Sequence, residues 1–126
     1  MADNSKKSLT LIGVISIIGL LALAMWYLTR PKPAYGNLDA FAQCLAKKEV
    51  TMYGADWCSH CQNEKKEFGK SFKYVPYVEC PDNPKQCLEK GVKGYPTWIF
   101  PDGTRLEGEQ GPEGLSKASG CALPKL

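Results

Sequence analysis

Two cysteines separated by two residues are the part of this sequence best suited to chemistry. Cys58 and Cys61 enclose Ser59 and His60, and Trp57 precedes them. A thiolate attacks the sulfur of a disulfide, and a second thiol close by resolves the mixed disulfide that forms. The spacing therefore indicates thiol–disulfide exchange.

A helix predicted to begin near Cys58 gives the two thiols different roles. Helical spacing continues to Phe68, with residues 64–67 predicted as a solvated charged face. Backbone N–H groups and the helix dipole favour a thiolate at Cys58, whereas Cys61 lies one turn inside and is shielded. We therefore predict Cys58 as the nucleophile and Cys61 as the resolving thiol. His60, when protonated, would stabilise the Cys58 thiolate, and the alternative is a plain helix-surface residue.

The segments around this helix alternate between helix and strand. Apolar spacing and β-rich runs predict seven further elements, namely helices at 37–48, 83–91 and 112–120 and strands at 50–54, 74–79, 97–100 and 105–107. Pro101-Asp102-Gly103 predicts the turn of a hairpin between the last two strands. The order predicts one small α/β domain over residues 37–126.

An uncharged segment precedes this domain. Residues 9–28 carry no charged side chain, and 20 helical residues span about 30 Å, the thickness of a bilayer's hydrocarbon core. We predict an N-terminal tail at 1–8, a transmembrane anchor at 9–28, a proline-containing linker at 29–36 and an extracytoplasmic domain. The alternative is a signal peptide cleaved after Ala22-Leu23-Ala24.

Charge and cysteine content limit the class of protein. Residues 37–126 hold 12 basic and 12 acidic side chains and are therefore neutral overall. The whole net charge of +3 comes from the residues that flank the apolar segment. A neutral domain has no basic face for phosphates, so nucleic-acid binding is excluded. All six cysteines follow residue 43, which favours an oxidising compartment such as the periplasm.

Four cysteines remain outside the Cys58/Cys61 pair. Cys80 and Cys87 are seven residues apart across a Pro-Asp-Asn-Pro turn, which predicts a structural disulfide or, alternatively, a second redox pair. Cys44 and Cys121 are then left as a pair by elimination. 

An alternative interpretation is that some of these cysteines form a zinc site. The thiolates of Cys58, Cys61, Cys80 and Cys87, with His60 as a further ligand, would suffice for tetrahedral zinc. We do not favour it, because zinc ribbons usually carry a second C-x-x-C where this chain has a six-residue gap. We expect neither a metal nor a cofactor.

The motif and its surroundings resemble the thioredoxin superfamily. Trp57-Cys58-Ser59-His60-Cys61 stands at a strand-to-helix junction, and Gly94-Tyr95-Pro96-Thr97 precedes a hairpin. MYGADWCSHC, YVEC and GYPTWIF are similar to the thioredoxin-like domain found fused to, or working beside, vitamin K epoxide reductase homologues. The resemblance covers about residues 38–120 and implies a thioredoxin-like fold, a small mixed sheet flanked by helices.

The resemblance also implies how substrates are held and who the partners are. Pro96 would follow a cis peptide bond and, with Tyr95, face Cys58 and pair with the substrate chain. Trp57 would pack beside the active pair, unless it is a core tryptophan. The Ser-His dipeptide is similar to that of disulfide isomerases and periplasmic oxidants, which implies a potential above the roughly −270 mV of thioredoxin. Partners would be protein thiols and disulfides, and a vitamin K epoxide reductase homologue or another membrane relay enzyme.

The sequence departs from the family pattern at two places. Met52 occupies the position where thioredoxins carry a buried acid, which puts a proton relay through such an acid in doubt. The first strand of the full fold is expected to be missing, which leaves the strand at 74–79 at the sheet edge. An edge position fits Pro76, because proline cannot donate a ladder hydrogen bond. The multi-helix membrane domain of the reductase is also missing, so we expect no quinone site in this chain.

Overall fold

A computed structural model describes residues 2–29 and 35–125 of the chain. The chain divides into two compact units, Met1–Pro33 and Ala34–Leu126. Most of the linker predicted at 29–36 lies outside the described residues.

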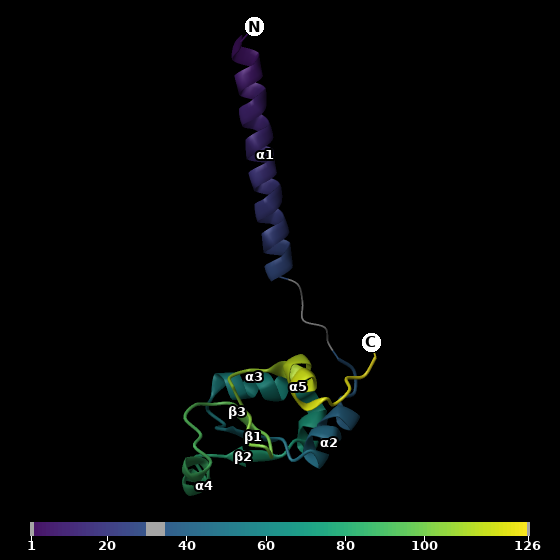
Figure 1. Cartoon of the computed structure of the whole chain (residues 1–126), viewed down its shortest axis with the longest axis vertical. Helices are drawn as coiled ribbons and strands as arrows, with labels where there is room; N and C mark the ends of the chain where they lie inside the picture. The colour runs from purple at the N-terminus through teal and green to yellow at the C-terminus, as the bar shows by residue number, and fades with distance from the viewer. Residues whose placement is uncertain (1, 30–34, 126) are drawn as a thin grey trace. The chain divides into compact units, whose positions relative to one another are not determined.

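The described part of the first unit consists of one helix. Helix α1 runs from Ala2 to Leu28 and so includes residues 2–8, which we expected as a tail (Figure 1). Its large apolar side chains from Ile12 to Leu28 are exposed. Within the two described ranges, none of the helices combines the length and the apolar character that crossing a membrane requires. The anchor predicted at 9–28 stays a prediction from the sequence.

The second unit is built on a four-stranded mixed sheet. Its strands are β1 (Thr51–Gly54), β2 (Tyr77–Glu79), β3 (Thr97–Ile99) and β4 (Arg105–Glu107). They lie in the order β2-β1-β3-β4, with β1 parallel to β2 and antiparallel to β3, and with β3 antiparallel to β4. The predicted α/β class and the predicted order of these strands and their helices along the chain are confirmed.

Helices flank this sheet. They are α2 (Asp39–Lys47), α3 (Ser59–Phe68), the 3₁₀ helix η1 (Gly69–Tyr74), α4 (Pro84–Glu89) and α5 (Gly111–Ser119). Figure 1 shows α3 beside α5, and α4 apart from both of them. Local signals set their ends: Pro84 begins α4 and Gly120, in the left-handed region at φ 71°, ends α5.

The edge of the sheet differs in detail from the prediction. Strand β2 begins at Tyr77 rather than at Tyr74, because Gly69–Tyr74 forms η1. β2 is an edge strand, as predicted, and no strand precedes Thr51 in the described part of the chain. The carbonyl of Pro76 accepts a hydrogen bond from the Met52 N–H at 2.9 Å, so the proline contributes an acceptor where it lacks a donor.

Apolar side chains cover both faces of the sheet. On one face Met52 of β1 lies opposite Trp98 of β3, and both pack in a cluster with Phe41, Phe68 and Leu115. Residues of the other face form a second cluster: Tyr53, Ile99, Cys80 and Cys87. Because adjacent residues of a strand point to opposite faces, the short strand β1 serves both clusters and is almost fully buried.

Candidate active site

Cys58 lies at the N-terminus of α3. It is the N-cap residue, with extended backbone, and its Sγ accepts a hydrogen bond from the Cys61 N–H at 3.2 Å. Its Sγ also lies 3.6 Å from the carbonyl oxygen of Tyr95. Cys58 is only 7% exposed, so little of its sulfur is in contact with solvent. A negative charge on this sulfur would be stabilised by the N–H group and by the helix dipole.

Cys61 lies one turn further along α3 and is fully buried. Burial raises the pKa of its thiol to about 12, and the hydrogen bond with Cys58 raises it further, while Ala55 and Lys65 lower it. Both cysteines are free thiols in the structure. The difference in burial is the one that the sequence predicted for a nucleophile and a resolving thiol, and the two roles stay predictions.

A cis peptide bond joins Tyr95 to Pro96 beside the dithiol. The Thr97 hydroxyl donates to the Gly94 carbonyl at 2.8 Å, and the Pro96 carbonyl accepts from the Gly108 N–H at 2.8 Å. These bonds fix the loop on both sides of the proline. The Tyr95 carbonyl therefore stays at Cys58 Sγ, where the resemblance placed the substrate-pairing segment.

Trp57 stands at the mouth of the site. Its side chain is 73% exposed, so it is not a core tryptophan, and its ring meets the Tyr95 ring edge-on at 5.9 Å between centroids. An open groove of about 520 Å³ begins here and is lined by Trp57, Cys58, Ser59, His60, Val92, Lys93, Gly94 and Tyr95. Exposed aromatic surface beside a reactive sulfur is suited to binding an extended polypeptide.

His60 points to a carboxylate in this structure. Its Nδ1 lies 2.5 Å from Oε1 of Glu109, and the Asn63 side-chain amide donates to the same oxygen at 3.2 Å. The imidazole is 68% exposed. Any effect of His60 on the Cys58 thiolate would therefore act through space, from two residues further along the chain. This effect stays a prediction.

Helix α3 carries a buried acid that was not expected from the sequence. Glu64 was expected on a solvated face but is 1% exposed. Its two carboxylate oxygens accept hydrogen bonds from the N–H groups of Gln110 and Gly111, each at 3.0 Å, at the start of α5. Burial raises the pKa of Glu64 to about 7, against the two N–H donors, which lower it. A signal was present in the helical spacing, since Glu64 follows the buried Cys61 by three residues.

The other four cysteines form two disulfides. Cys44 is bonded to Cys121 and Cys80 to Cys87, which are the predicted pairs. Cys80 and Cys87 are 2% and 4% exposed, and this burial favours a structural cross-link over a second redox pair. Because these two sulfurs are bonded to each other, they are not thiolate ligands for zinc. In residues 2–29 and 35–125, no three His, Cys, Asp or Glu side chains are grouped to hold a metal ion.

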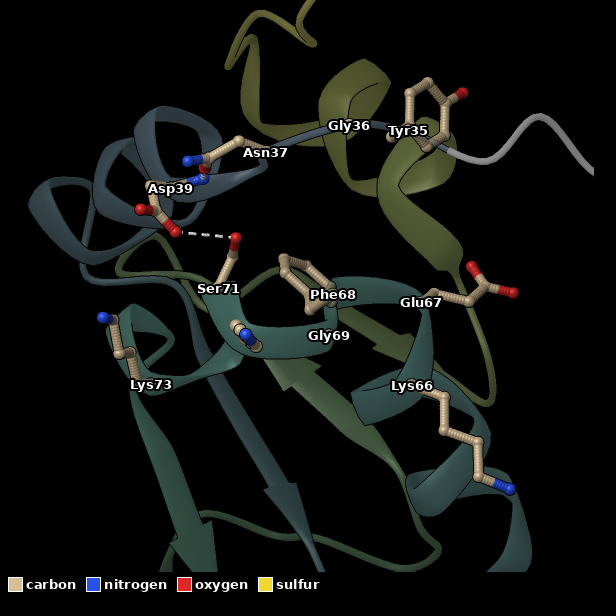
Figure 2. Close-up of a pocket in the computed structure, with 11 residues that line it drawn as sticks. Tyr35, Gly36, Asn37, Asp39, Lys66, Glu67, Phe68, Gly69, Ser71 and Lys73 are labelled. Atoms are coloured by element: carbon tan, nitrogen blue, oxygen red, sulfur yellow. Dashed lines mark hydrogen bonds between the residues drawn. The ribbon is translucent and has the colours of Figure 1, made fainter.

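A second hollow, of about 410 Å³, lies where the start of α2 meets the end of α3 and η1. Figure 2 shows the Ser71 hydroxyl donating to the Asp39 carboxylate, at 2.7 Å. The Ser71 Oγ also accepts from the Leu38 N–H at 3.2 Å. These polar groups are used in joining the two helices, and the dithiol does not line this hollow. We assign it no chemistry.

A free dithiol at a helix N-terminus, held against a cis-proline loop on a small mixed sheet, defines a thiol–disulfide oxidoreductase domain. Comparisons with known proteins agree with this class. Residues 34–119 match the thioredoxin family model. The chain is also 39% identical over 93 residues to the thiol-disulfide oxidoreductase LTO1 of Arabidopsis thaliana. 

The two matches cover different shares of the proteins compared. The family model covers more than half of the chain, so this protein belongs to the thioredoxin family. The match to LTO1 covers 67% of this chain but 24% of that protein. The chain thus corresponds to about a quarter of the length of this relative.

Proposed function

We propose that this protein is a membrane-anchored, extracytoplasmic oxidoreductase that exchanges disulfides with protein clients. The observation that carries the proposal is the pair of free thiols with unequal burial, Cys58 at the helix terminus and Cys61 beneath it. The Cys58 thiolate attacks a client disulfide and releases one client thiolate. Cys61 then attacks Cys58 Sγ, which forms the Cys58–Cys61 disulfide and releases the second client thiolate. The reverse sequence oxidises a client dithiol.

Clients are held as extended polypeptide. The cis-proline loop holds the Tyr95 carbonyl at the reactive sulfur, and the exposed ring of Trp57 flanks it. Backbone pairing gives affinity with little sequence preference, which suits an enzyme that acts on many proteins. 

The assay for this activity uses the full chain in detergent and a peptide disulfide with a fluorescence readout. We expect wild-type protein to accelerate its exchange with glutathione, and Cys58→Ser to lose the acceleration. Cys80→Ser/Cys87→Ser is the matched control, since it removes two sulfurs outside the site and should keep most activity. If the Cys80→Ser/Cys87→Ser control lost activity while Cys58→Ser stayed active, Cys80 and Cys87 would be the redox pair and the proposal would be wrong.

The anchor and the recycling partner are the second part of the proposal. The anchor is supported by the uncharged residues 9–28 and by the exposed apolar side chains of α1, since a large exposed apolar surface marks a membrane or protein contact. Two disulfides support an oxidising compartment. The partner is a membrane disulfide-relay enzyme of the vitamin K epoxide reductase type, which would take electrons from the Cys58/Cys61 dithiol.

Anchoring raises the effective concentration of the two proteins in the membrane. A fragment beginning at Tyr35 should therefore keep its activity on small disulfides but exchange much more slowly with the partner in membranes. Equal relay rates for fragment and full chain, or a mature protein that begins at Met25, would contradict the anchored relay.

A further inference from the structure

Cys61 must lose a proton before it attacks the mixed disulfide, and the structure offers it an unusual route. This inference rests on the proposed function, because it concerns the resolving step of that reaction. The thiol is fully buried, and Met52, the residue six positions before Cys58, is a buried apolar side chain that accepts no proton. The buried Glu64 on the same helix has both of its oxygens engaged by the N–H groups of Gln110 and Gly111. We therefore look for the proton acceptor of Cys61 on another element.

The register of the sheet brings two polar side chains to the face that Cys61 packs against. In the parallel pair β1/β2, Met52 is aligned with Tyr77 and Gly54 with Glu79. Residues two apart in a strand share a face, so Tyr77 and Glu79 lie on the same face of β2. 

Gly54 is the point where this face meets Cys61. A Cβ atom placed on Gly54 would lie 2.9 Å from Cys61 Sγ and 3.3 Å from the Tyr77 hydroxyl oxygen. The absence of a side chain at Gly54 thus lets the thiol and the phenol approach the same small space. Because both atoms lie close to this one point, they are no more than about 6 Å apart, a gap that a proton can cross directly or through one water molecule.

The phenol is linked onward to a carboxylate. The Tyr77 hydroxyl donates to Glu79 Oε2, and the other oxygen of Glu79, Oε1, accepts from the Asp56 N–H at 2.9 Å. Glu79 is partly exposed and belongs to the edge strand, where no further strand covers it in the described part of the chain. The carboxylate can therefore exchange protons with water.

The charged groups around the phenol complete the cluster. From α3, Lys65 Nζ lies 4.0 Å from the centroid of the Tyr77 ring and 2.9 Å from Asp56 Oδ1. Burial, and then the hydrogen bond to Glu79, raise the pKa of Tyr77, and Asp56 and Cys61 add to this. The phenol thus stays protonated at rest, and it can accept a proton on its oxygen only as it gives its own proton to Glu79.

We propose that Tyr77 and Glu79 form a proton relay that connects the buried Cys61 thiol to solvent at the open edge of the sheet. In the resolving step the Cys61 proton moves to the Tyr77 oxygen while the Tyr77 proton moves to the Glu79 carboxylate. The Cys61 thiolate forms the bond to Cys58 Sγ, and the bond from Cys58 to the client sulfur breaks, which releases the client as a thiolate. Glu79 then returns its proton to water. In the oxidising direction the same pair protonates Cys61 as it leaves.

The test is a single-turnover experiment with the full chain in detergent, as wild type, Tyr77→Phe and Glu79→Gln. Reduced protein is mixed with excess oxidised glutathione between pH 6 and 9, quenched with acid and analysed by mass spectrometry for the mixed disulfide. We expect both variants to form the mixed disulfide at the wild-type rate but to resolve it more slowly at pH 7, on the order of 10²-fold. The remaining rate should rise about tenfold per pH unit, as hydroxide removes the proton instead.

Controls separate this relay from a structural role and from the proposed function. Tyr74→Phe removes a phenol outside the cluster and should resolve at the wild-type rate. Unchanged resolution in both relay variants, or an equal slowing of formation and resolution, overturns the relay. If Tyr77→Phe does not fold, Glu79→Gln decides, because its amide oxygen still accepts the Asp56 N–H. Failure of the wild type to form any mixed disulfide would instead overturn the proposed function.

Discussion

The carboxylate of Glu64 on α3 accepts the N–H of Gly111 at 3.0 Å, which ties the active-site helix to the first turn of α5. Its second oxygen accepts the Gln110 N–H, so one buried side chain satisfies two donors at a helix start. Helix α5 ends beside Cys121, which is bonded to Cys44 of α2. The helix that carries both redox cysteines is thus joined through α5 to α2.

Glu64 gives the stability of the domain a pH dependence. The pKa of its carboxyl group is about 7 in the folded domain, against an ordinary value of 4.5 that applies to the unfolded chain. Between pH 4.5 and pH 7 the native state therefore binds more protons than the unfolded state. The free energy of unfolding should therefore fall as pH rises from about 4.5 to about 7, by at most about 1.4 kcal/mol per pH unit. Thermal unfolding of wild type and Glu64→Gln across this range measures it, and the variant should show a flatter profile. Glu89→Gln, an exposed carboxylate, is the control. A wild-type profile that rises over the same range would contradict the assignment.

Gly54→Ala should destabilise the domain by about 1–3 kcal/mol, because its Cβ would lie 2.9 Å from Cys61 Sγ and 3.2 Å from the Tyr77 ring. Gly94→Ala is the matched control, since a Cβ there meets nothing within 4 Å. Denaturant unfolding of both variants gives the comparison. Equal stability of the two would mean that the space at Gly54 is not closed by Cys61 and Tyr77.

The two structural disulfides should differ in what they contribute. Cys44–Cys121 closes a sequence separation of 77 residues and Cys80–Cys87 one of 7. In the chain-entropy model, removing the first as Cys44→Ser/Cys121→Ser costs about 4–5 kcal/mol, and removing the second as Cys80→Ser/Cys87→Ser costs about 2 kcal/mol. Denaturant unfolding of the two double variants tests this order. The reverse order would show that strain or residual structure, and not loop length, decides.

His60→Pro should lower the reduction potential of the Cys58/Cys61 pair. An imidazolium near the N-terminus of α3 favours the Cys58 thiolate and hence the reduced form, and proline is tolerated in the first turn of a helix. The change should be on the order of 10 mV, because the residue is exposed. Equilibration with glutathione measures it, with Ser59→Ala as the neutral neighbour. An unchanged or higher potential would remove His60 from the mechanism.

Much of the fold could be predicted because local signals agreed with the tertiary structure. The apolar run at 50–54, Pro84 and Pro112 at helix starts and the Pro101-Asp102-Gly103 turn each acted through nearby residues. The start of β2 was misplaced, because the aromatic residues at 72, 74 and 77 suit a strand, whereas residues 69–74 form η1 and these side chains pack against the core of the domain. That choice depends on distant partners such as Leu38 and Asp39, which are hydrogen-bonded to Ser71 of η1 and which periodicity does not reveal.

The site was predictable as far as the motifs reached. Cys58, Cys61 and the Tyr95–Pro96 bond follow from the motif and the family resemblance. Glu64 and Tyr77 were beyond reach because their roles depend on long-range contacts. A charged residue on a polar helix looks solvated until the start of α5 is known to lie over it. Tyr77 meets Cys61 only through the register of β1 with β2.

The central claim is that Cys58 attacks the client and Cys61 resolves the product, and trapping tests it most directly. Cys61→Ser and Cys58→Ser, each in the full chain, are incubated with a protein disulfide and analysed by mass spectrometry after the free thiols are blocked. The account predicts that Cys61→Ser accumulates a mixed disulfide through Cys58, since only the resolving step is lost, and that Cys58→Ser forms none. A mixed disulfide trapped through Cys61 in Cys58→Ser, with none in Cys61→Ser, would contradict it.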